Sequence, residues 1–153
     1  MENKKEMVVS AIENGTVIDH IPTDAVYQAI RILGLENYKD ELLIGNYLAS
    51  GKLGRKGIIK IKNKHFTKEE INKIALVAPF VTIINIENFK VVDKFSADIP
   101  DHVDNIVRCA NPKCITNAEA VATRFEMVDK ETLKMRCHYC EKFTTRETMK
   151  FIE

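Results

Sequence analysis

Four cysteines occur near the C-terminal end of the chain, as two closely spaced pairs. Cys109 and Cys114 lie in RCANPKC, and Cys137 and Cys140 lie in RCHYC, which gives C-x4-C and C-x2-C separated by 22 residues. Two such pairs can converge as four thiolates around one tetrahedral Zn²⁺ ion, with Zn–S distances of about 2.3 Å. The spacing therefore predicts one structural zinc ion per chain, held by these four cysteines.

Other uses of the cysteines fit the sequence less well. A redox dithiol in CHYC would usually open a helix, whereas the following EKFTTRE has the composition of a strand or loop. Disulfides need an oxidising compartment, but MENKKEMVV lacks the apolar run of an export signal, so we expect a cytoplasmic protein. A catalytic zinc needs an open coordination position, which four thiolates do not leave. His138 could replace one ligand, although a residue between two ligands is expected to face solvent.

A second group that could do chemistry is Asp19 beside His20 in GTVIDHI. An acid next to an imidazole can be half of a catalytic pair, part of a ligand site, or ordinary surface or packing. Adjacent residues on a regular strand point to opposite faces, so the two share a site only if the strand twists or lies at an edge. Because no nucleophile or open metal site accompanies them, an enzyme is the least favoured interpretation.

A basic run covers residues 51–65, GKLGRKGIIKIKNKH, and contains no acid. It is either a solvated hairpin whose lysines protect a sheet edge or a cradle for phosphate groups. Neither a Walker loop nor a Rossmann glycine pattern is present. Strand alternation predicts Lys60, Lys62 and Lys64 on one face, where Lys94 joins them if its strand is a neighbour. The basic residues of the run are Lys52, Arg55, Lys56, Lys60, Lys62 and Lys64.

The elements that must position these groups follow a β-α-β-β-α-β order. Thr23 and Gly34 are expected to bound the first helix, and a Thr67–Glu70 capping box and Pro79 the second. This order predicts an α+β domain, a ferredoxin-like antiparallel sheet with two helices on one face. The expected strands are 16–21, 41–48, 57–62, 81–87 and 90–95, and the expected helices are 23–34 and 67–79.

The sequence changes character after Phe95, where SADIPDH has no periodicity. We therefore expect one domain over residues 1–100 and a second over 101–153. The second domain is too short to be stable without a cross-link such as a bound metal ion, and all four cysteines lie inside it. Strand-like AVATRFEMV and TLKMRC between the pairs predict a small all-β, zinc-ribbon-like domain.

The charge balance argues against a polyanionic partner. The chain has 23 basic and 22 acidic residues, and residues 101–153 have nine of each. Phosphate binding by counterion release requires a basic surface, so the second domain is predicted to dock on protein. A nucleic-acid-binding module using the basic run remains the alternative. No stretch approaches the roughly 20 apolar residues that span a bilayer, so no membrane partner is expected.

The chain as a whole resembles the regulatory chains of aspartate carbamoyltransferase. The motifs GTVIDHIP, GRKGIIKI, ALVAP, IENFKVVDK, DNIVRCANPKCITNAEAV and CHYCEK match that family in order and spacing. The resemblance implies a non-catalytic subunit of pyrimidine biosynthesis. Its first domain would bind the nucleotide effectors CTP, UTP or ATP, and its zinc domain would dock on the catalytic chain.

The resemblance also implies an effector site in which Asp19 and His20 recognise sugar and phosphate. Ile84 stands where Asn is familiar in the family, and Phe89 where Tyr is familiar, so the choice of base stays open. The implied effector-binding residues are Ala11, Ile12, Val17, Asp19, His20, Lys56, Lys60, Phe89, Val91 and Lys94.

The family assembly joins catalytic trimers through regulatory-chain homodimers. We expect the homodimer to form by pairing of sheet edges, with residues 41–48 as the candidate edge, and no nucleic acid to take part. The expected docking residues around the zinc are Asn111, Lys113, Glu119, Tyr139 and Lys142.

Overall fold

The structure is a computed structural model that describes residues 11–51 and 54–152, so Lys52 of the basic run lies outside the described residues. The chain forms two compact units, which divide between Asp98 and Ile99. No helix in the described ranges has the length and apolarity needed to cross a membrane.

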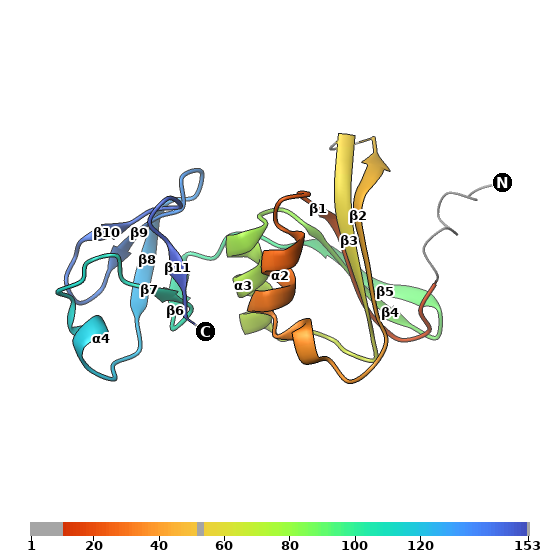
Figure 1. Ribbon diagram of the computed structural model, residues 1–153, viewed down its shortest axis with the longest axis horizontal. Coiled ribbons are helices and arrows are strands. Elements are labelled where there is room, and N and C mark those ends of the chain that lie inside the picture. Colours follow the sequence, from red (N-terminus) through yellow and green to blue (C-terminus); the bar gives the residue numbers. More distant parts are fainter. Residues whose placement is uncertain (1–10, 52–53, 153) are drawn as a thin grey trace. The chain divides into compact units, whose positions relative to one another are not determined.

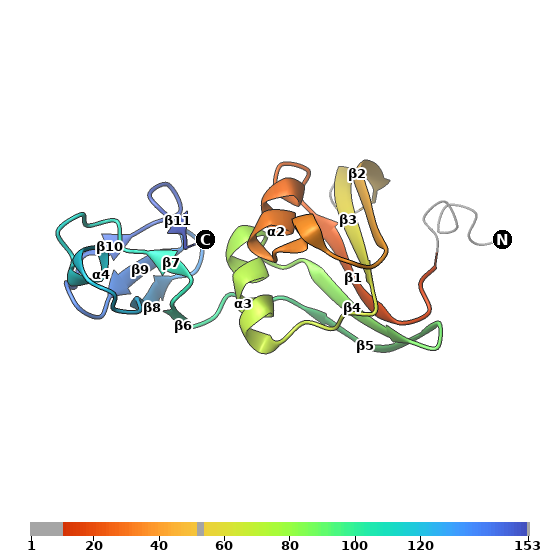
Figure 2. The ribbon, with the colours of Figure 1, turned by 60° about the horizontal axis from the view of Figure 1, so that its bottom comes forward.

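The first unit is an antiparallel five-stranded sheet with two helices on one face (Figures 1 and 2). The strand order is β2-β3-β1-β4-β5, with β1 between β3 and β4. This confirms the predicted α+β, ferredoxin-like arrangement, to which β5 adds a strand through a hairpin with β4. The elements are β1 (Gly15–Ile21), α2 (Val26–Ile32), the 3-10 helix η1 (Leu35–Asn37), β2 (Leu42–Ser50), β3 (Gly54–Lys62), α3 (Lys68–Val77), β4 (Thr82–Glu87) and β5 (Lys90–Ser96).

The core of this unit lies between the sheet and the helices. Ile59, Ile18 and Ile83 are register partners on β3, β1 and β4, and all three are buried. Because paired residues point to the same face, they form one apolar row under the helices. Gly57 allows the helix layer to approach, since a Cβ at this position would lie 2.1 Å from Cγ2 of Val26.

The predicted helix ends are right for α3 and partly wrong for α2. Thr67 and Glu70 form the capping box in both directions, as the sequence predicts. The first helix does not start at Thr23, because residues 22–25 form a turn closed by a hydrogen bond from Ala25 N to Pro22 O. Its N-cap is Ala25, which makes no side-chain cap. Gly34 follows the helix with φ of 66°, a left-handed conformation that glycine adopts at little cost.

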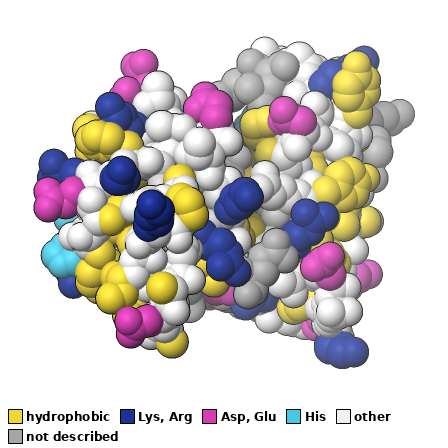
Figure 3. Space-filling model, turned by 60° about the vertical axis from the view of Figure 1, so that its left-hand side comes forward, with side chains coloured by type: hydrophobic (Ala, Val, Ile, Leu, Met, Phe, Trp, Pro, Cys, Tyr) yellow, Lys and Arg dark blue, Asp and Glu magenta, His cyan; other side chains and the backbone are white. Residues whose placement is uncertain are grey.

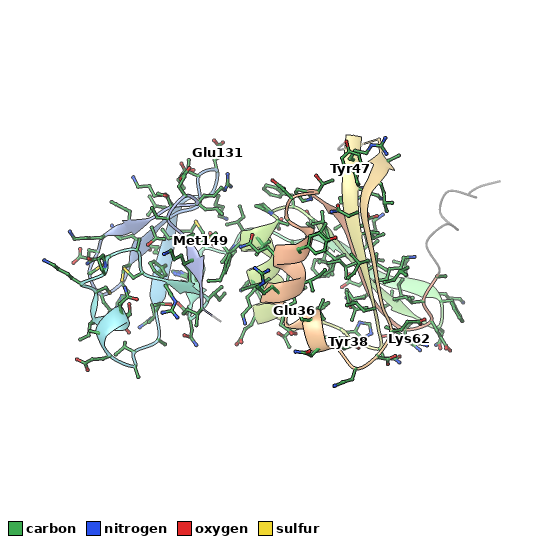
Figure 4. All side chains as sticks on the ribbon, in the orientation of Figure 1. Glu36, Tyr38, Tyr47, Lys62, Glu131 and Met149 are labelled. Atoms are coloured by element: carbon green, nitrogen blue, oxygen red, sulfur yellow. The ribbon has the colours of Figure 1, made fainter. Side chains whose placement is uncertain are left out.

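The C-terminal end of β3 differs from the predicted alternation. The strand ends at Lys62, whose carbonyl accepts a hydrogen bond from the Tyr38 hydroxyl (Figure 4). Asn63 then adopts φ of 60°, which redirects the chain. Nζ of Lys64 lies 3.5 Å from Oε2 of Glu70 on the adjacent helix. The prediction that Lys64 shares a face with Lys60 is therefore wrong, because the strand stops before it.

The second unit is built mainly from short strands, which confirms the predicted small all-β domain. One sheet has the order β10-β9-β8-β6, and β7 pairs with β11 in a separate ladder. Its buried apolar side chains include Phe125, Leu133 and Met135, together with Ile99, Val103, Ile106 and Val107. The elements are β6 (His102–Asp104), β7 (Val107–Arg108), α4 (Ile115–Ala118), β8 (Arg124–Asp129), β9 (Lys134–Cys137), β10 (Phe143–Thr144) and β11 (Lys150–Phe151).

Candidate functional site

The second unit gathers all four cysteines into one cluster. Their Sγ atoms all lie within 4.8 Å of one another, and three of the side chains are buried while Cys140 is partly exposed. Cys109 and Cys114 flank the turn that leads into α4, whereas Cys137 ends β9 and Cys140 follows it. Two knuckles that are separate in sequence therefore present their sulfur atoms to a common centre.

The geometry fits a tetrahedral metal ion better than disulfide bonds. The Sγ atoms of Cys109 and Cys140 are 3.6 Å apart, and those of Cys114 and Cys137 are 3.7 Å apart. A tetrahedron with Zn–S bonds of about 2.3 Å has S–S edges of about 3.8 Å, whereas a disulfide bond is about 2.05 Å long. All four cysteines are free thiols in the structure. A soft, four-thiolate donor set of this size fits zinc.

The electrostatics of the cluster also favour a cation. Burial raises the pKa of Cys109 and of Cys137, so each resists ionisation by itself. Burial acts in the same direction on Cys140, but hydrogen bonds with the Asn111 side chain, the Lys142 backbone and the side chains of Cys109 and Cys137 together outweigh it and lower the pKa to about 7. Several thiolates cannot share this space without a compensating positive charge, and a divalent metal supplies one.

Hydrogen bonds around the cluster hold the ligand knuckles in place. The Thr116 hydroxyl donates to Sγ of Cys114 over 3.2 Å. Nδ2 of Asn117 donates to the carbonyls of Cys109 and Asn111 over 2.9 and 2.8 Å, which ties the first knuckle to α4. Thr116 and Asn117 are not among the predicted site residues, and the sequence marks them only as polar residues just after the second cysteine.

A second candidate site lies on the face of the first unit opposite the helices. Lys60, Val17, Ile84 and Lys94 are successive register partners on β3, β1, β4 and β5. They form one row across the sheet, with a lysine at each end and two apolar side chains between. Three strand spacings separate the two lysines, about 14 Å. Burial lowers the pKa of Lys60, and the Asp19 carboxylate partly offsets this effect.

Asp19 and His20 come together because β1 contains a bulge. The pairing with β3 shifts register between Ile18 and Ile21, and His20 adopts φ of 60°. Ile18 and Ile21 are both buried in the core, so the extra residue leaves Asp19 and His20 outside it. Asp19 Oδ1 lies 2.8 Å from Nζ of Lys56, and its Oδ2 lies 4.0 Å from Nδ1 of His20. The bulge thus groups an acid, an imidazole and a lysine beside the lysine row.

The turn of the β4–β5 hairpin supplies the remaining predicted side chains. Asn88 and Phe89 have φ of 53° and 64°, the conformation of a tight two-residue hairpin turn. The Phe89 amide donates to Glu13 O over 2.9 Å, and the Asn88 amide donates to Oδ1 of Asn14 over 3.1 Å. The segment before β1 is therefore pinned to the hairpin.

The effector residues carried over from the family form three neighbouring groups. These groups are the row with Val17, Lys60 and Lys94, the bulge cluster with Asp19, His20 and Lys56, and the hairpin end with Phe89 and Val91. Phe89 and Val91 expose 66% and 60% of their surface, so both are open to a ligand. Ala11 and Ile12 directly precede the pinned segment.

The predicted docking residues lie around the cysteine cluster. Lys113, Glu119, Tyr139 and Lys142 are exposed, and Asn111 is partly exposed. Lys and Arg side chains are interspersed with acidic and hydrophobic ones on the molecular face in Figure 3. A mixture of this kind is typical of protein surfaces.

Comparisons with known proteins identify relatives over almost the whole chain. The family model "Aspartate carbamoyltransferase regulatory chain, allosteric domain" matches residues 7–98. The model for the metal binding domain of the same regulatory chain matches residues 101–150. A regulatory chain of this name from Bacteroides fragilis is 49% identical over 151 residues, 99% of each chain. The one from Pyrococcus horikoshii is 48% identical over 144 residues, 93% of this chain and 95% of the relative.

Proposed function

The chain belongs to the family of aspartate carbamoyltransferase regulatory chains, and from this premise we propose that it senses nucleotides in its first domain and controls catalytic chains through its second. It is a non-catalytic subunit. The effectors are CTP, UTP or ATP, and the metal is one zinc ion bound by Cys109, Cys114, Cys137 and Cys140. Cysteines that bind zinc without forming disulfide bonds are typical of a reducing compartment, which supports a cytoplasmic location.

The main support for nucleotide binding is the row Lys60–Val17–Ile84–Lys94 with the bulge cluster beside it. A nucleoside triphosphate requires ammonium groups for its phosphates, an acceptor for its ribose hydroxyls and an apolar surface for its base. Lysines at both ends of the row, the Asp19 carboxylate and the exposed apolar side chains of Phe89 and Val91 supply these groups on one face.

Two residues of this site bear on the choice of base. Ile84 lies in the centre of the row and offers no side-chain hydrogen bond, and Phe89 offers a ring without a hydroxyl. We propose that the base is therefore selected by backbone polar groups of the pinned segment, including residues near Ile12, and by packing on these apolar side chains. Selectivity between purine and pyrimidine effectors is then a matter of fit and backbone pairing.

The zinc domain acts as the docking element. When bound, zinc cross-links the two knuckles, so the exposed residues around it are presented as one rigid surface. Asn111, Lys113, Glu119, Tyr139 and Lys142 form the contact with the catalytic chain. An effector changes activity only if it binds the low- and high-activity states unequally, and such coupling typically amounts to about 1–3 kcal/mol.

The regulatory chains pair with each other through the exposed edge of the first sheet. Among the strands that the structure describes, β2 lies at an edge of the sheet, as predicted for residues 41–48. Leu43 and Ile44 on it expose 39% and 41% of their surface. Unpaired backbone groups beside apolar side chains are suited to pairing with the same strand of a second copy.

One experiment tests the whole proposal. The zinc-loaded chain is mixed with the catalytic trimer of aspartate carbamoyltransferase from the same organism, complex formation is measured with and without a zinc chelator, and CTP, UTP and ATP are titrated against activity. We expect a complex only with zinc, and activity that depends on the nucleotides. Failure of the zinc-loaded chain to associate would refute the proposed function.

The effector site is tested separately on the isolated chain. Lys60→Ala and Lys94→Ala each remove a charge-assisted contact to phosphate, which contributes about 1.5–3 kcal/mol, so affinity should fall about tenfold or more. Lys68→Ala, an exposed lysine on α3 of the opposite face, is the matched control and should bind normally. Unchanged affinity in both site variants would place the nucleotide elsewhere.

A further inference from the structure

Two cations face each other on the short ladder of the second unit. Arg108 on β7 and Lys150 on β11 are direct register partners, so their side chains leave the ladder on the same side. Both are exposed, whereas their neighbour Val107 is buried. Within the described residues, neither forms an ion pair with a carboxylate. Like charges placed directly opposite each other on a ladder are destabilising.

These cations line a cavity that contains no acidic side chain. The cavity has a volume of about 590 Å³, and its other lining residues are Cys109, Ala110, Pro112, Asn117 and Thr148. Arg108 and Lys150 supply fixed positive charge at the surface, and the one other lining residue that is charged in the zinc-loaded protein is Cys109, whose thiolate is buried and bound to the metal. The exposed part of the cavity therefore has the electrostatic character of an anion site, although the unit as a whole has balanced charge.

We propose that Arg108 and Lys150 receive a carboxylate side chain of the catalytic chain when the second unit docks. The proposal rests on the proposed function and adds a charged contact to the docking surface. A guanidinium presents a planar fork that matches a carboxylate with two hydrogen bonds, and an ammonium adds a point charge. Because both cations are exposed, a free anion binds here only weakly. A carboxylate on a docked partner binds better, because docking holds it at high effective concentration.

The position of the cavity connects it to the metal centre. Cys109 is one of the four clustered cysteines, and Asn117 donates hydrogen bonds to the carbonyls of Cys109 and Asn111. The knuckle that the metal holds in place is thus one wall of the cavity. Docking through this contact consequently requires the metal, as does docking through the residues around the knuckle.

The test measures association of the zinc-loaded full chain with catalytic trimers at several sodium chloride concentrations. Arg108→Gln and Lys150→Gln should each weaken association by about tenfold, and the double variant should also show a smaller loss of affinity with salt. Their zinc content should be unchanged, and the melting temperature of the isolated variants should be equal or higher, because the repulsion between the two cations is gone. A purely structural role would lower the melting temperature.

Lys130→Gln is the control, because Lys130 is an exposed lysine whose Nζ lies 3.0 Å from Oδ1 of Asp101. It should bind trimers as the wild type does. Wild-type affinity and salt dependence in the double variant would overturn the carboxylate contact while leaving the proposed function intact. Inorganic phosphate could also raise the melting temperature of the wild type but not of the double variant. If the two nevertheless bound trimers equally well, the carboxylate contact would likewise be overturned. If the wild type itself failed to bind trimers, both the proposed function and this contact would be refuted.

Discussion

Single residues in unusual backbone conformations shape the face of the first sheet that carries the proposed effector site. His20 at φ of 60° is the extra residue of a bulge, and it allows two adjacent side chains, Asp19 and His20, to lie outside the core together. Phe89 at φ of 64° occupies a turn position that usually belongs to glycine. Left-handed backbone costs an L-residue about 1–2 kcal/mol, and such outliers are often found where a ligand binds.

Replacing Phe89 separates backbone strain from ligand contact. Phe89→Gly relieves the strained φ and loses little packing, because the ring is 66% exposed. The added freedom of the unfolded chain offsets about 0.4–1 kcal/mol of this relief, so the first unit should be equally stable or up to about 1 kcal/mol more stable. Nucleotide affinity should nevertheless fall about tenfold, as measured by calorimetric titration, because the base loses its apolar contact.

Phe89→Ala is the matched comparison, since it removes the ring and keeps the strain. It should lose the same affinity without the gain in thermal stability. A glycine variant that melts below the alanine variant would show that the turn is not strained. Full nucleotide affinity in both variants would exclude the ring from the site.

The starts of the two helices show when a local sequence motif fixes where a helix begins. The capping box at Thr67 satisfies backbone groups on both sides of the start of α3, and the side chains of Thr67 and Glu70 take part reciprocally. Thr23 looks similar in sequence but lies in a turn before α2, where Ala25 holds the N-cap position. A threonine near the start of a helix therefore stabilises the helix only if it occupies the N-cap position. Thr67 does so, whereas Thr23 does not, because the chain makes a turn before α2 begins.

Thr67→Ala should destabilise the first unit by about 1 kcal/mol, because the first turn of α3 loses its side-chain acceptor. Thr23→Ala should change stability by less than about 0.5 kcal/mol, as is usual away from special contacts. Thermal or urea unfolding of the first unit measures both. Equal losses in the two variants would contradict the observed start of α2.

The edge strand β2 yields a test of dimerisation. Ile44→Lys places a charge on the exposed apolar edge, so regulatory-chain dimers should dissociate to monomers at micromolar concentration in analytical ultracentrifugation. Val92→Lys is the control, because Val92 is 53% exposed on β5, the edge strand on the opposite side of the sheet. Monomers from Val92→Lys but not from Ile44→Lys would assign the interface to the other edge.

The whole molecule combines a unit with a large apolar core and a unit in which four cysteines form a metal-binding cluster. The first unit buries an apolar layer between five strands and two helices. The second unit consists of short strands around a four-cysteine cluster. Domains of this size usually need a metal ion or disulfide bonds to be stable. Metal binding is then part of the folding free energy of the docking unit.

Removing zinc with a chelator should unfold the second unit and leave the first unit folded. Hydrogen-exchange mass spectrometry should show loss of amide protection across β6 to β11 and unchanged protection in β1 to β5. Cys114→Ser should have the same effect without a chelator. Burial raises the pKa of Cys109, so zinc must displace its proton, and apparent zinc affinity should fall as the pH falls. Persistent protection in the zinc-free second unit would contradict a structural metal.

The sequence determined those features that depend on local pattern. The order of strands and helices, the α3 capping box and the end of the first helix at Gly34 follow from periodicity and turn chemistry over a few residues. The short cysteine spacings predicted a shared site in the same way. The tertiary structure alone decided the start of α2, the redirection of Lys64 and the bulge at His20, because each depends on which way the chain turns against a neighbouring strand or helix. It also decided that Arg108 faces Lys150, since strand register joins residues that are distant in sequence.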